Sequence, residues 1–362
     1  MTRILLALFI LSSCSSVPKP AVGSSGAHGQ PKAVVPTAPP LEIAPTPKGT
    51  AAFLARVVTS VGDNRAPRFS PDGAKLLFLS SSRPSHKHAQ VYELELSRMT
   101  EHRVTFHDGD DEGAGWAAGG QKIVYSSMTD EMKEDVSLAR IKSVYEASKE
   151  TTAPNGIRPI VTMSGGDVYL QRLDGRDIER LTSTSAADTS PTADVSSKSA
   201  RIVYASNRTG DKRLYLFDGK STRVISQGPD SNPSFSSDGK ALVWERLLSA
   251  DKTASTQLMM TENLKTAVPL TSPGFTDRQP SWNAKNDAVV FSSNRGGKNF
   301  DLYMIDRKAS CLKRLTHVRV DLAWPSISSD GSKIAFSARV NGQNQIYTME
   351  ERSASLPCEA AP

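Results

Sequence analysis

The chain has 362 residues, and its 44 lysine and arginine residues against 38 acidic ones give a net charge of +6. No long basic block is present, so this charge indicates a mixed, soluble surface and excludes nucleic-acid binding. The sequence contains no Gly-x-Ser-x-Gly elbow, no His-Glu-x-x-His and no glycine-rich phosphate loop, which favours a protein that is not an enzyme.

Residues 1–13 are predicted to be a secretory signal. A positive charge at Arg3 precedes an apolar run from Ile4 to Leu11, which is too short to span a membrane as a helix. The adjoining "LSSC" resembles the bacterial lipobox, in which the chain is cut before the cysteine and the thiol is acylated, for example with palmitate. Because Ser15 rather than aspartate follows Cys14, the same resemblance implies an outer-membrane lipoprotein that faces the periplasm. The alternatives are an ordinary signal peptide with a chance cysteine and a buried strand.

Residues 14–52 are predicted to be a disordered tether. They are rich in Pro, Ala, Gly and Ser and hold eight prolines. Such a composition cannot bury enough apolar surface to offset the entropy of ordering the chain. An extended segment of this kind reaches at most about 3 Å per residue, so it suits a folded body held away from a lipid anchor.

Residues 53–362 contain a repeat of six segments, each with an anchor residue, a turn and a closing aromatic residue. The segments are "PRFSPDGAKLLF", "AGWAAGGQKIVY", "PTADVSSKSARIVY", "PSFSSDGKALVW", "PSWNAKNDAVVF" and "PSISSDGSKIAF". Their anchors fall at 67, 114, 191, 233, 280 and 325, and four of the five gaps between anchors are 42 to 47 residues. A period of this length is typical of propeller blades.

Each repeat predicts four antiparallel strands. The proline is expected to open the first strand, where no donor is needed, and Asp-Gly supplies a tight turn. Second strands such as "KIVY" and "AVVF" lack polar alternation, so burial on both faces is expected. The Ser-Asn-Arg segments lead into a third strand, and "ERLT", "PLT" and "KRLT" predict an outer strand. The predicted fold class is all-β, a six-bladed β-propeller with four-stranded antiparallel blades.

The two ends of this body predict how the ring closes. The last repeat has a third strand at "QIYTME" but no Arg-Leu-Thr strand after it, whereas "ARVVT" precedes the first repeat. We therefore expect residues 53–60 to supply the outer strand of the last blade, which removes a sheet edge.

The combined pattern of Pro-x-Phe-Ser-x-Asp-Gly, Ser-Asn-Arg, Tyr and Arg-Leu-Thr over residues 53–350 resembles the six-bladed propeller of TolB, the periplasmic protein of the Tol–Pal system. The resemblance implies a propeller that binds an envelope protein, with a peptidoglycan-associated lipoprotein of the Pal kind as the first candidate. TolB has a folded N-terminal α/β domain and an N-terminal stretch that meets TolA. In this chain the predicted tether is found in place of both, which is a departure from the family pattern.

The long gap between the second and third anchors predicts a helical insertion at 128–157. Leu138, Ile141 and Tyr145 follow a helical spacing, with charged residues on the other side. The insertion is either a helix packed on the edge of the blade or an arm that binds a partner.

Two cysteines remain if Cys14 carries lipid. Cys311 and Cys358 each follow a third strand, in the fifth and sixth repeats, and should lie towards the same rim of neighbouring blades. In an oxidising compartment we expect them to form a disulfide, the alternative being two free thiols.

An aspartate lies three or four residues before each anchor. These candidate partner-binding or cation-binding residues are Asp63, Asp110, Asp111, Asp188, Asp230, Asp277 and Asp321. Loops that return to the inner strands should surround the axial channel, where the carboxylates could accept a basic peptide, a partner loop or Ca²⁺. The alternative is that each aspartate caps its own turn. The nearby aromatic residues, Phe69, Trp116, Phe235 and Trp282, are assigned to packing between blades.

No other cofactor or metal is predicted, since His86 and His88 fall in a polar turn that suits a solvated loop better than a metal site. The sequence thus predicts a monomeric, non-enzymatic, lipid-anchored propeller that binds a protein partner through its channel mouth. One alternative is a propeller hydrolase or lyase acting on an envelope polysaccharide or peptide, which needs paired carboxylates about 5–10 Å apart. The other is a purely structural envelope component.

The lipidation site gives a first prediction. Cys14→Ser should move the protein from the membrane fraction to the soluble periplasmic fraction, because the substitution removes the acyl chains and leaves the export signal. Fractionation of cells followed by immunoblotting measures this, and retention of the variant in the membrane would contradict the lipobox interpretation.

Overall fold

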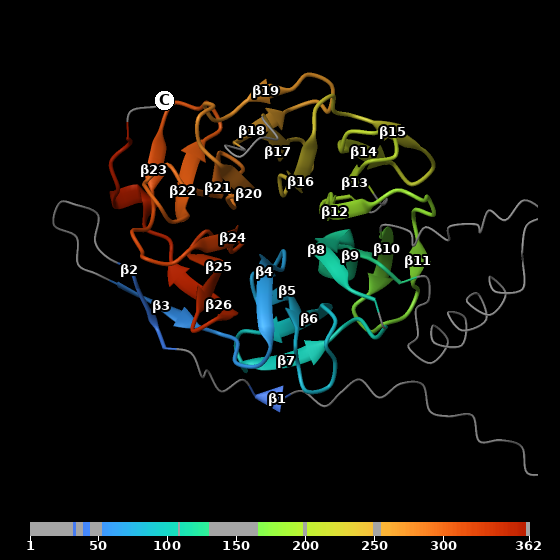
Figure 1. Ribbon diagram of the computed structural model, residues 1–362, viewed down its shortest axis with the longest axis horizontal. Helices are drawn as coiled ribbons and strands as arrows, with labels where there is room; N and C mark the ends of the chain where they lie inside the picture. The colour runs from blue at the N-terminus through green and yellow to red at the C-terminus, as the bar shows by residue number, and fades with distance from the viewer. Residues whose placement is uncertain are drawn as a thin grey trace, which may run out of the picture.

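The computed structural model of the chain describes residues 32–33, 39–43, 53–107, 109–129, 166–197, 201–248 and 255–359. In these residues six antiparallel sheets stand around a central axis, with the first strand of each blade innermost (Figure 1). The predicted signal, Cys14 and residues 130–157 of the predicted insertion lie outside the described residues. Within the described ranges, no helix has the length and apolar character needed to cross a membrane.

Each blade has four strands, ordered from the axis outward. The first is formed by β4 (Asp63–Phe69), β5 (Lys75–Ser81), β6 (Gln90–Glu95) and β7 (Thr100–Arg103). The second is formed by β8 (Asp111–Ala117), β9 (Lys122–Ser127), β10 (Asp167–Arg172) and β11 (Glu179–Arg180). The third is formed by β12 (Asp188–Ala193), β13 (Ile202–Ser206), β14 (Arg213–Phe217) and β15 (Thr222–Val224).

The remaining blades follow the same order. The fourth contains β16 (Asp230–Phe235), β17 (Leu242–Leu247), β18 (Thr256–Thr261) and β19 (Val268–Pro269). The fifth contains β20 (Asp277–Trp282), β21 (Ala288–Ser293), β22 (Asp301–Asp306) and β23 (Leu312–Arg314). The sixth contains β24 (Leu322–Ile327), β25 (Lys333–Val340), β26 (Gln343–Glu350) and, from the other end of the chain, β3 (Phe53–Val57). Short 3-10 turns lie at η1 (Ala118–Gly120) and η2 (Ser353–Ser355).

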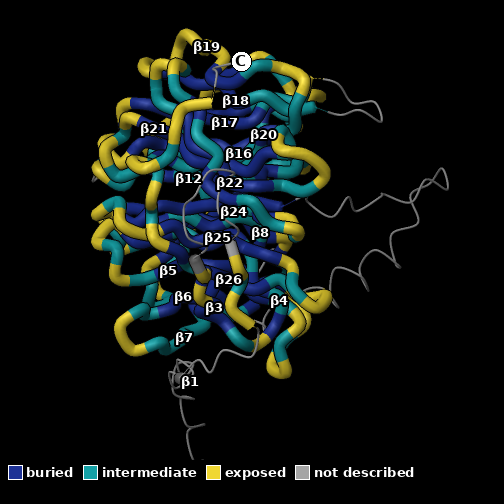
Figure 2. The backbone as a smooth tube through the Cα atoms, turned by 90° about the vertical axis from the view of Figure 1, so that its left-hand side faces the viewer, coloured by how far each residue is buried: buried dark blue, intermediate teal, exposed yellow. Residues whose placement is uncertain are grey.

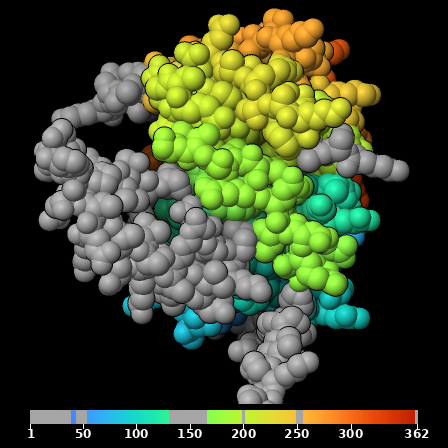
Figure 3. All heavy atoms as spheres, turned by 90° about the vertical axis from the view of Figure 1, so that its right-hand side faces the viewer, coloured from blue at the N-terminus to red at the C-terminus, as the bar shows by residue number. Residues whose placement is uncertain are grey.

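The hydrophobic core lies between the blades. One cluster joins Val243 and Leu258 of the fourth blade to Trp282 and Phe291 of the fifth, and the other clusters are built in the same way. The second strands are buried along their length, as their unbroken apolar runs predict, while the exposed residues are concentrated in the turns (Figure 2). Figure 3 shows the third and fourth blades, in green to yellow, packed against each other without a break.

The closing aromatic residue of a repeat packs against a tyrosine of the third strand in five of the blades. The ring centroids are 5.6–6.1 Å apart in the pairs Phe78–Tyr92, Tyr125–Tyr169, Tyr204–Tyr215, Phe291–Tyr303 and Phe336–Tyr347. In the fourth blade Trp244 lies opposite Met259 instead. This pairing explains why the closing aromatic residue of the second strand and the tyrosine of the third strand recur together in the sequence.

Every inner strand carries a β-bulge just before its anchor. The residue that precedes the anchor has a positive φ between 48° and 69° in all six blades: Ala66, Gly113, Ser190, Asn232, Gln279 and Trp324. The expectation that the proline opens the first strand was therefore wrong, because the strand begins three or four residues earlier. A proline is tolerated inside this strand because the strand is the inner edge of its sheet and is already bulged there.

A hydroxyl just beyond each outer strand accepts a hydrogen bond from a backbone N–H of the third strand, at 2.8–3.0 Å. The donor and acceptor pairs are Val91–Thr105, Val168–Thr182, Leu214–Ser226, Leu258–Thr271, Leu302–Thr316 and Ile346–Thr59. The threonine of the Arg-Leu-Thr pattern thus fastens the outer edge of its blade.

The N-terminal part of the propeller closes the ring, as predicted. Strand β3 pairs with β26, with Val57 opposite Tyr347 and Arg56 opposite Thr348 (Figure 1). The contact continues beyond the strand, where Val58 N donates to Ile346 O at 2.8 Å. Two short strands from the segment predicted as the tether add to outer edges: β1 (Lys32–Ala33) pairs with β7, and β2 (Leu41–Ile43) pairs with β3. At the other end of the chain, a disulfide joins Cys311 to Cys358.

Deleting residues 53–60 should lower the thermal midpoint sharply, because it exposes the edge of β26 and removes the buried Ala55 and Val57. The matched control is Leu54→Ser, since Leu54 lies on the same strand but is 61% exposed. Thermal unfolding followed by circular dichroism measures both, and an unchanged midpoint for the deletion would contradict this closure.

Candidate functional site

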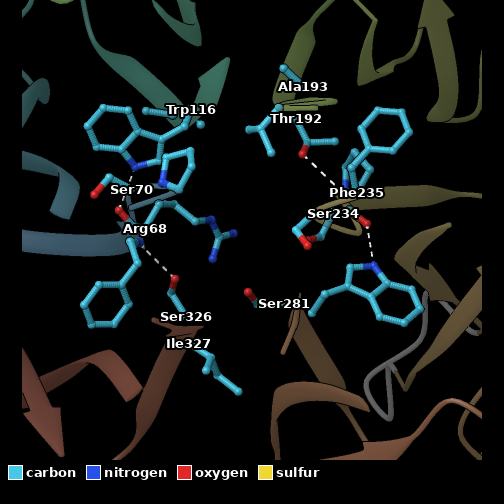
Figure 4. Close-up of a pocket in the computed structure, with 18 of the residues that line it drawn as sticks. Arg68, Ser70, Trp116, Thr192, Ala193, Ser234, Phe235, Ser281, Ser326 and Ile327 are labelled. Atoms are coloured by element: carbon cyan, nitrogen blue, oxygen red, sulfur yellow. Dashed lines mark hydrogen bonds between the residues drawn. The ribbon is translucent and has the colours of Figure 1, made fainter. Parts of the chain in front are cut away.

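The inner strands surround a cavity of about 480 Å³ whose lining comes from all six blades (Figure 4). The position after the repeat anchor faces it in every blade: Arg68, Gly115, Thr192, Ser234, Ser281 and Ser326. The bulge that precedes each of these residues shifts the strand register there, so the same sequence position reaches the cavity six times. Four of these six positions consequently present a small hydroxyl side chain to the cavity.

Hydrogen bonds from one blade to the next fasten the cavity wall. The Trp116 indole N–H donates to Arg68 O, and the Trp282 indole N–H donates to Ser234 O, both at 3.0 Å. Phe69 N donates to Ser326 Oγ at 3.1 Å. These bonds satisfy backbone groups on the free edges of the inner strands, which have no neighbouring strand on the cavity side.

The aromatic residues assigned to blade packing from the sequence, Phe69, Trp116, Phe235 and Trp282, are each no more than 8% exposed. Each belongs to one of the hydrophobic clusters between blades. All four residues therefore pack between blades, and the indole N–H groups of Trp116 and Trp282 donate to the backbone of the neighbouring blade.

Arg68 is the charged residue among those that the structure describes around the cavity. Its guanidinium lies 5.7 Å from the centre of the Trp324 ring and donates one hydrogen bond, 3.4 Å long, to Pro325 O. Burial lowers the pKa of Arg68 to about 10, against an opposing effect of Glu245. The side chain is therefore still a cation at neutral pH.

Sequence reasoning missed Arg68. The signal was present, because the residue after the anchor is Ser, Thr or Gly in five repeats and Arg only in the first. It was overlooked because an arginine in a strand ordinarily points to solvent, and only the ring places this position in a cavity.

The seven aspartates predicted as binding residues do not line this cavity. Asp188, Asp230 and Asp277 begin inner strands, are fully buried and each pair with an arginine of their own blade. The pairs are Asp188–Arg208 at 2.8 Å, Asp230–Arg246 at 2.8 Å and Asp277–Arg295 at 2.6 Å. Arg208 and Arg295 of the Ser-Asn-Arg pattern, and Arg246 in the fourth blade, thus neutralise carboxylates inside their blades.

In the second blade a histidine, rather than an arginine, lies beside the aspartate that begins the inner strand. His107 Nε2 lies 3.2 Å from Asp111 Oδ1, and Thr105 donates to Asp111 Oδ2 at 2.6 Å. Burial is the largest influence on Asp111 and raises the pKa of its carboxyl group, against the effect of His107.

The other three aspartates are less buried and accept backbone or amide hydrogen bonds. Asp63 accepts from Asn344 Nδ2 at 2.9 Å, Asp110 from Ala89 N at 2.6 Å, and Asp321 from Phe300 N at 2.9 Å. In the described part of the chain, these residues form no group of three or more acidic, histidine or cysteine side chains that could hold a metal ion. Asp108, which belongs to the same acidic segment as Asp110 and Asp111, lies outside the described residues.

The two histidines of the polar turn are held within the first blade. His86 Nδ1 lies 2.8 Å from His88 O, and His86 Nε2 lies 2.7 Å from the Tyr92 hydroxyl. The His88 ring is exposed, and its Nδ1 lies 3.5 Å from Asp110 Oδ1.

The closed ring and its axial cavity define the protein as a six-bladed propeller with a pocket on its axis. Residues 153–300 match the family model of the TolB beta propeller domain. The chain is also similar to the protein TolB homolog of Chlorobium luteolum, with 27% identity over 156 residues, or 42% of this chain and 34% of that protein. The chain is thus a TolB-like propeller that spans about a third of the length of this curated relative.

Solved structures share the fold. The crystal structure of TolB from Acinetobacter baumannii has a TM-score of 0.51 and 16% identity, over 83% of this chain and 64% of that chain. An oligogalacturonate lyase from Vibrio parahaemolyticus has a TM-score of 0.55 and 11% identity, over 91% of this chain and 100% of that chain. At these identities the likeness is one of fold alone.

The buried ion pairs give a testable contrast. Asp277→Asn should reduce the free energy of unfolding by roughly 3 kcal/mol, because it leaves the Arg295 guanidinium buried without its counter-ion. Asp321→Asn removes the same charge at an exposed position and should cost less than about 0.5 kcal/mol. Urea unfolding measures both, and equal losses would contradict the structural role of Asp277.

Proposed function

We propose that this protein is a non-enzymatic component of the bacterial envelope whose propeller binds a protein partner at the axial cavity. In this proposal Cys14 anchors it to the outer membrane as a lipoprotein, residues 15–52 connect the anchor to the propeller, and the propeller faces the periplasm. A peptidoglycan-associated lipoprotein of the Pal kind is the first candidate partner.

The observation that carries the proposal is the cavity wall, in which hydroxyl groups and one guanidinium lie among apolar side chains on a closed ring. Such a wall can hold polar groups of a partner by hydrogen bonds. The match of residues 153–300 to the TolB beta propeller domain and the similarity to a TolB homolog support an envelope protein.

A second candidate function is a lyase that acts on an acidic polysaccharide. The likeness in fold to an oligogalacturonate lyase over 91% of this chain favours it. Acid–base cleavage by two carboxylates needs both groups beside the substrate, whereas the described wall of the cavity presents Arg68 and hydroxyls. We therefore place the binding function first.

Photo-crosslinking in intact cells tests the proposal. A photoreactive amino acid at Ser237, which is exposed and lies at the cavity, should capture one envelope protein that mass spectrometry identifies as a Pal-like lipoprotein. The control position is Val224, which is 47% exposed on the outer strand β15.

The two positions separate the outcomes. Capture from Ser237 and not from Val224 supports binding at the cavity, whereas the same products from both positions contradict it. Release of unsaturated products from oligogalacturonate by the purified protein would establish the lyase instead.

A further inference from the structure

Arg68 differs from three other partly buried arginines because it forms no direct ion pair with a carboxylate of the described residues. Arg208, Arg246 and Arg295 each lie within 2.8 Å of an aspartate oxygen. In the described part of the chain, Arg68 has only the carbonyl oxygen of Pro325, at 3.4 Å, and the ring of Trp324. Arg68 is partly buried, and the Glu245 carboxylate raises its pKa although the two side chains form no direct ion pair. The guanidinium therefore still gains from an anion that enters the cavity and pairs with it directly.

Two hydroxyl groups complete the polar lining. The side chains of Ser234 and Ser281 make no hydrogen bond to any residue that the structure describes, in contrast to Ser326 and Thr192, which accept from backbone N–H groups of Phe69 and Phe235. In Figure 4 the Arg68 guanidinium points into the cavity, with Ser234 and Ser281 on the other side. One cation and two available donors thus face the same cavity.

We propose that the axial cavity contains a carboxylate-binding subsite, in which Arg68 pairs with an aspartate or glutamate side chain of a partner peptide and Ser234 and Ser281 donate to the same group. The inference rests on the proposed function and names the chemical group that the cavity recognises. A guanidinium can hold a carboxylate through two parallel hydrogen bonds, which gives direction as well as strength.

A carboxylate fits the charge of this cavity better than a phosphate group. Arg68 supplies a single positive charge, whereas a phosphomonoester carries about −1.5 to −2 at neutral pH. A carboxylate therefore neutralises Arg68 without leaving an excess negative charge in a partly buried space.

A peptide side chain fits the walls better than an acidic sugar. Sugar rings pack on open aromatic faces, but Trp116 and Trp282 are only 5% and 6% exposed, and the guanidinium of Arg68 lies over the ring of Trp324. The apolar parts of the lining, among them Ala66 and Pro191, suit the aliphatic stem of an acidic side chain. The cavity thus offers apolar contacts beside the cation.

Isothermal titration calorimetry with short peptides tests the subsite. The probes are acetylated and amidated Gly-Ser pentapeptides with a central Asp or Glu, and the same peptides with Asn or Gln. We expect the acidic peptides to bind about tenfold more tightly than the amides, a difference of about 1.4 kcal/mol. Arg68→Gln should abolish this preference, whereas Arg223→Gln, which removes the same charge from an exposed position on β15, should leave it unchanged.

A second variant keeps the test independent of any effect of Arg68 on folding. The double substitution Ser234→Ala and Ser281→Ala removes only the two unbonded hydroxyls and should weaken the acidic peptides about threefold without changing the thermal midpoint. Equal binding of acidic and amide peptides by the unaltered protein overturns the subsite. Tighter Arg68-dependent binding of digalacturonate or inorganic phosphate than of the acidic peptides also overturns it as a peptide site.

The outcomes remain distinct from those of the proposed function. If the peptides show no preference while crosslinking at Ser237 still captures an envelope protein, the carboxylate inference is wrong and the proposed function stands. If the acidic peptides bind through Arg68 while no envelope protein is captured, the proposed function is wrong and the cavity remains a carboxylate site.

Discussion

The structure depends on one constraint: a four-stranded blade can bury its faces only against the blades on either side. Each second strand carries a buried apolar run, so each blade needs two neighbours, and a row of blades would leave two apolar faces in water. The ring must therefore close, and it closes through β3 and Thr59, which occupy in the sixth blade the place that the Arg-Leu-Thr segment holds in other blades. One short segment thus supports all six interfaces.

Closure also creates the cavity. The inner strands have no neighbour in their own sheet on the side of the axis, so their backbone groups find partners on the next blade. Bonds such as Trp116 Nε1 to Arg68 O tie adjacent inner strands together, and the repeated bulges bring equivalent residues to the same level. The ring therefore determines that the residue after each anchor lies at the cavity, whereas the type of side chain at this position differs between blades.

The position of a charged residue along the inner strand determines whether it lies inside its blade or at the cavity. Three aspartates that begin inner strands, Asp188, Asp230 and Asp277, are enclosed in their blades and neutralised there by arginines. Arg68, further along its strand, enters the cavity without such a partner. An acidic repeat pattern in the sequence is thus compatible with a cavity whose described lining carries a positive charge.

The sequence by itself determined the number of blades, the strands of each blade and the strand that closes the ring. These features follow from the spacing of apolar residues and turns along the chain, which is a local property. The sequence also placed Cys311 and Cys358 on neighbouring blades, where the structure joins them. Only the tertiary structure decided that the proline of each repeat lies within a bulged strand, that the buried aspartates turn towards arginines or a histidine, and that Arg68 faces the axis. The direction of a side chain on an edge strand depends on the neighbouring blade, and the period of a repeat contains no information about that contact.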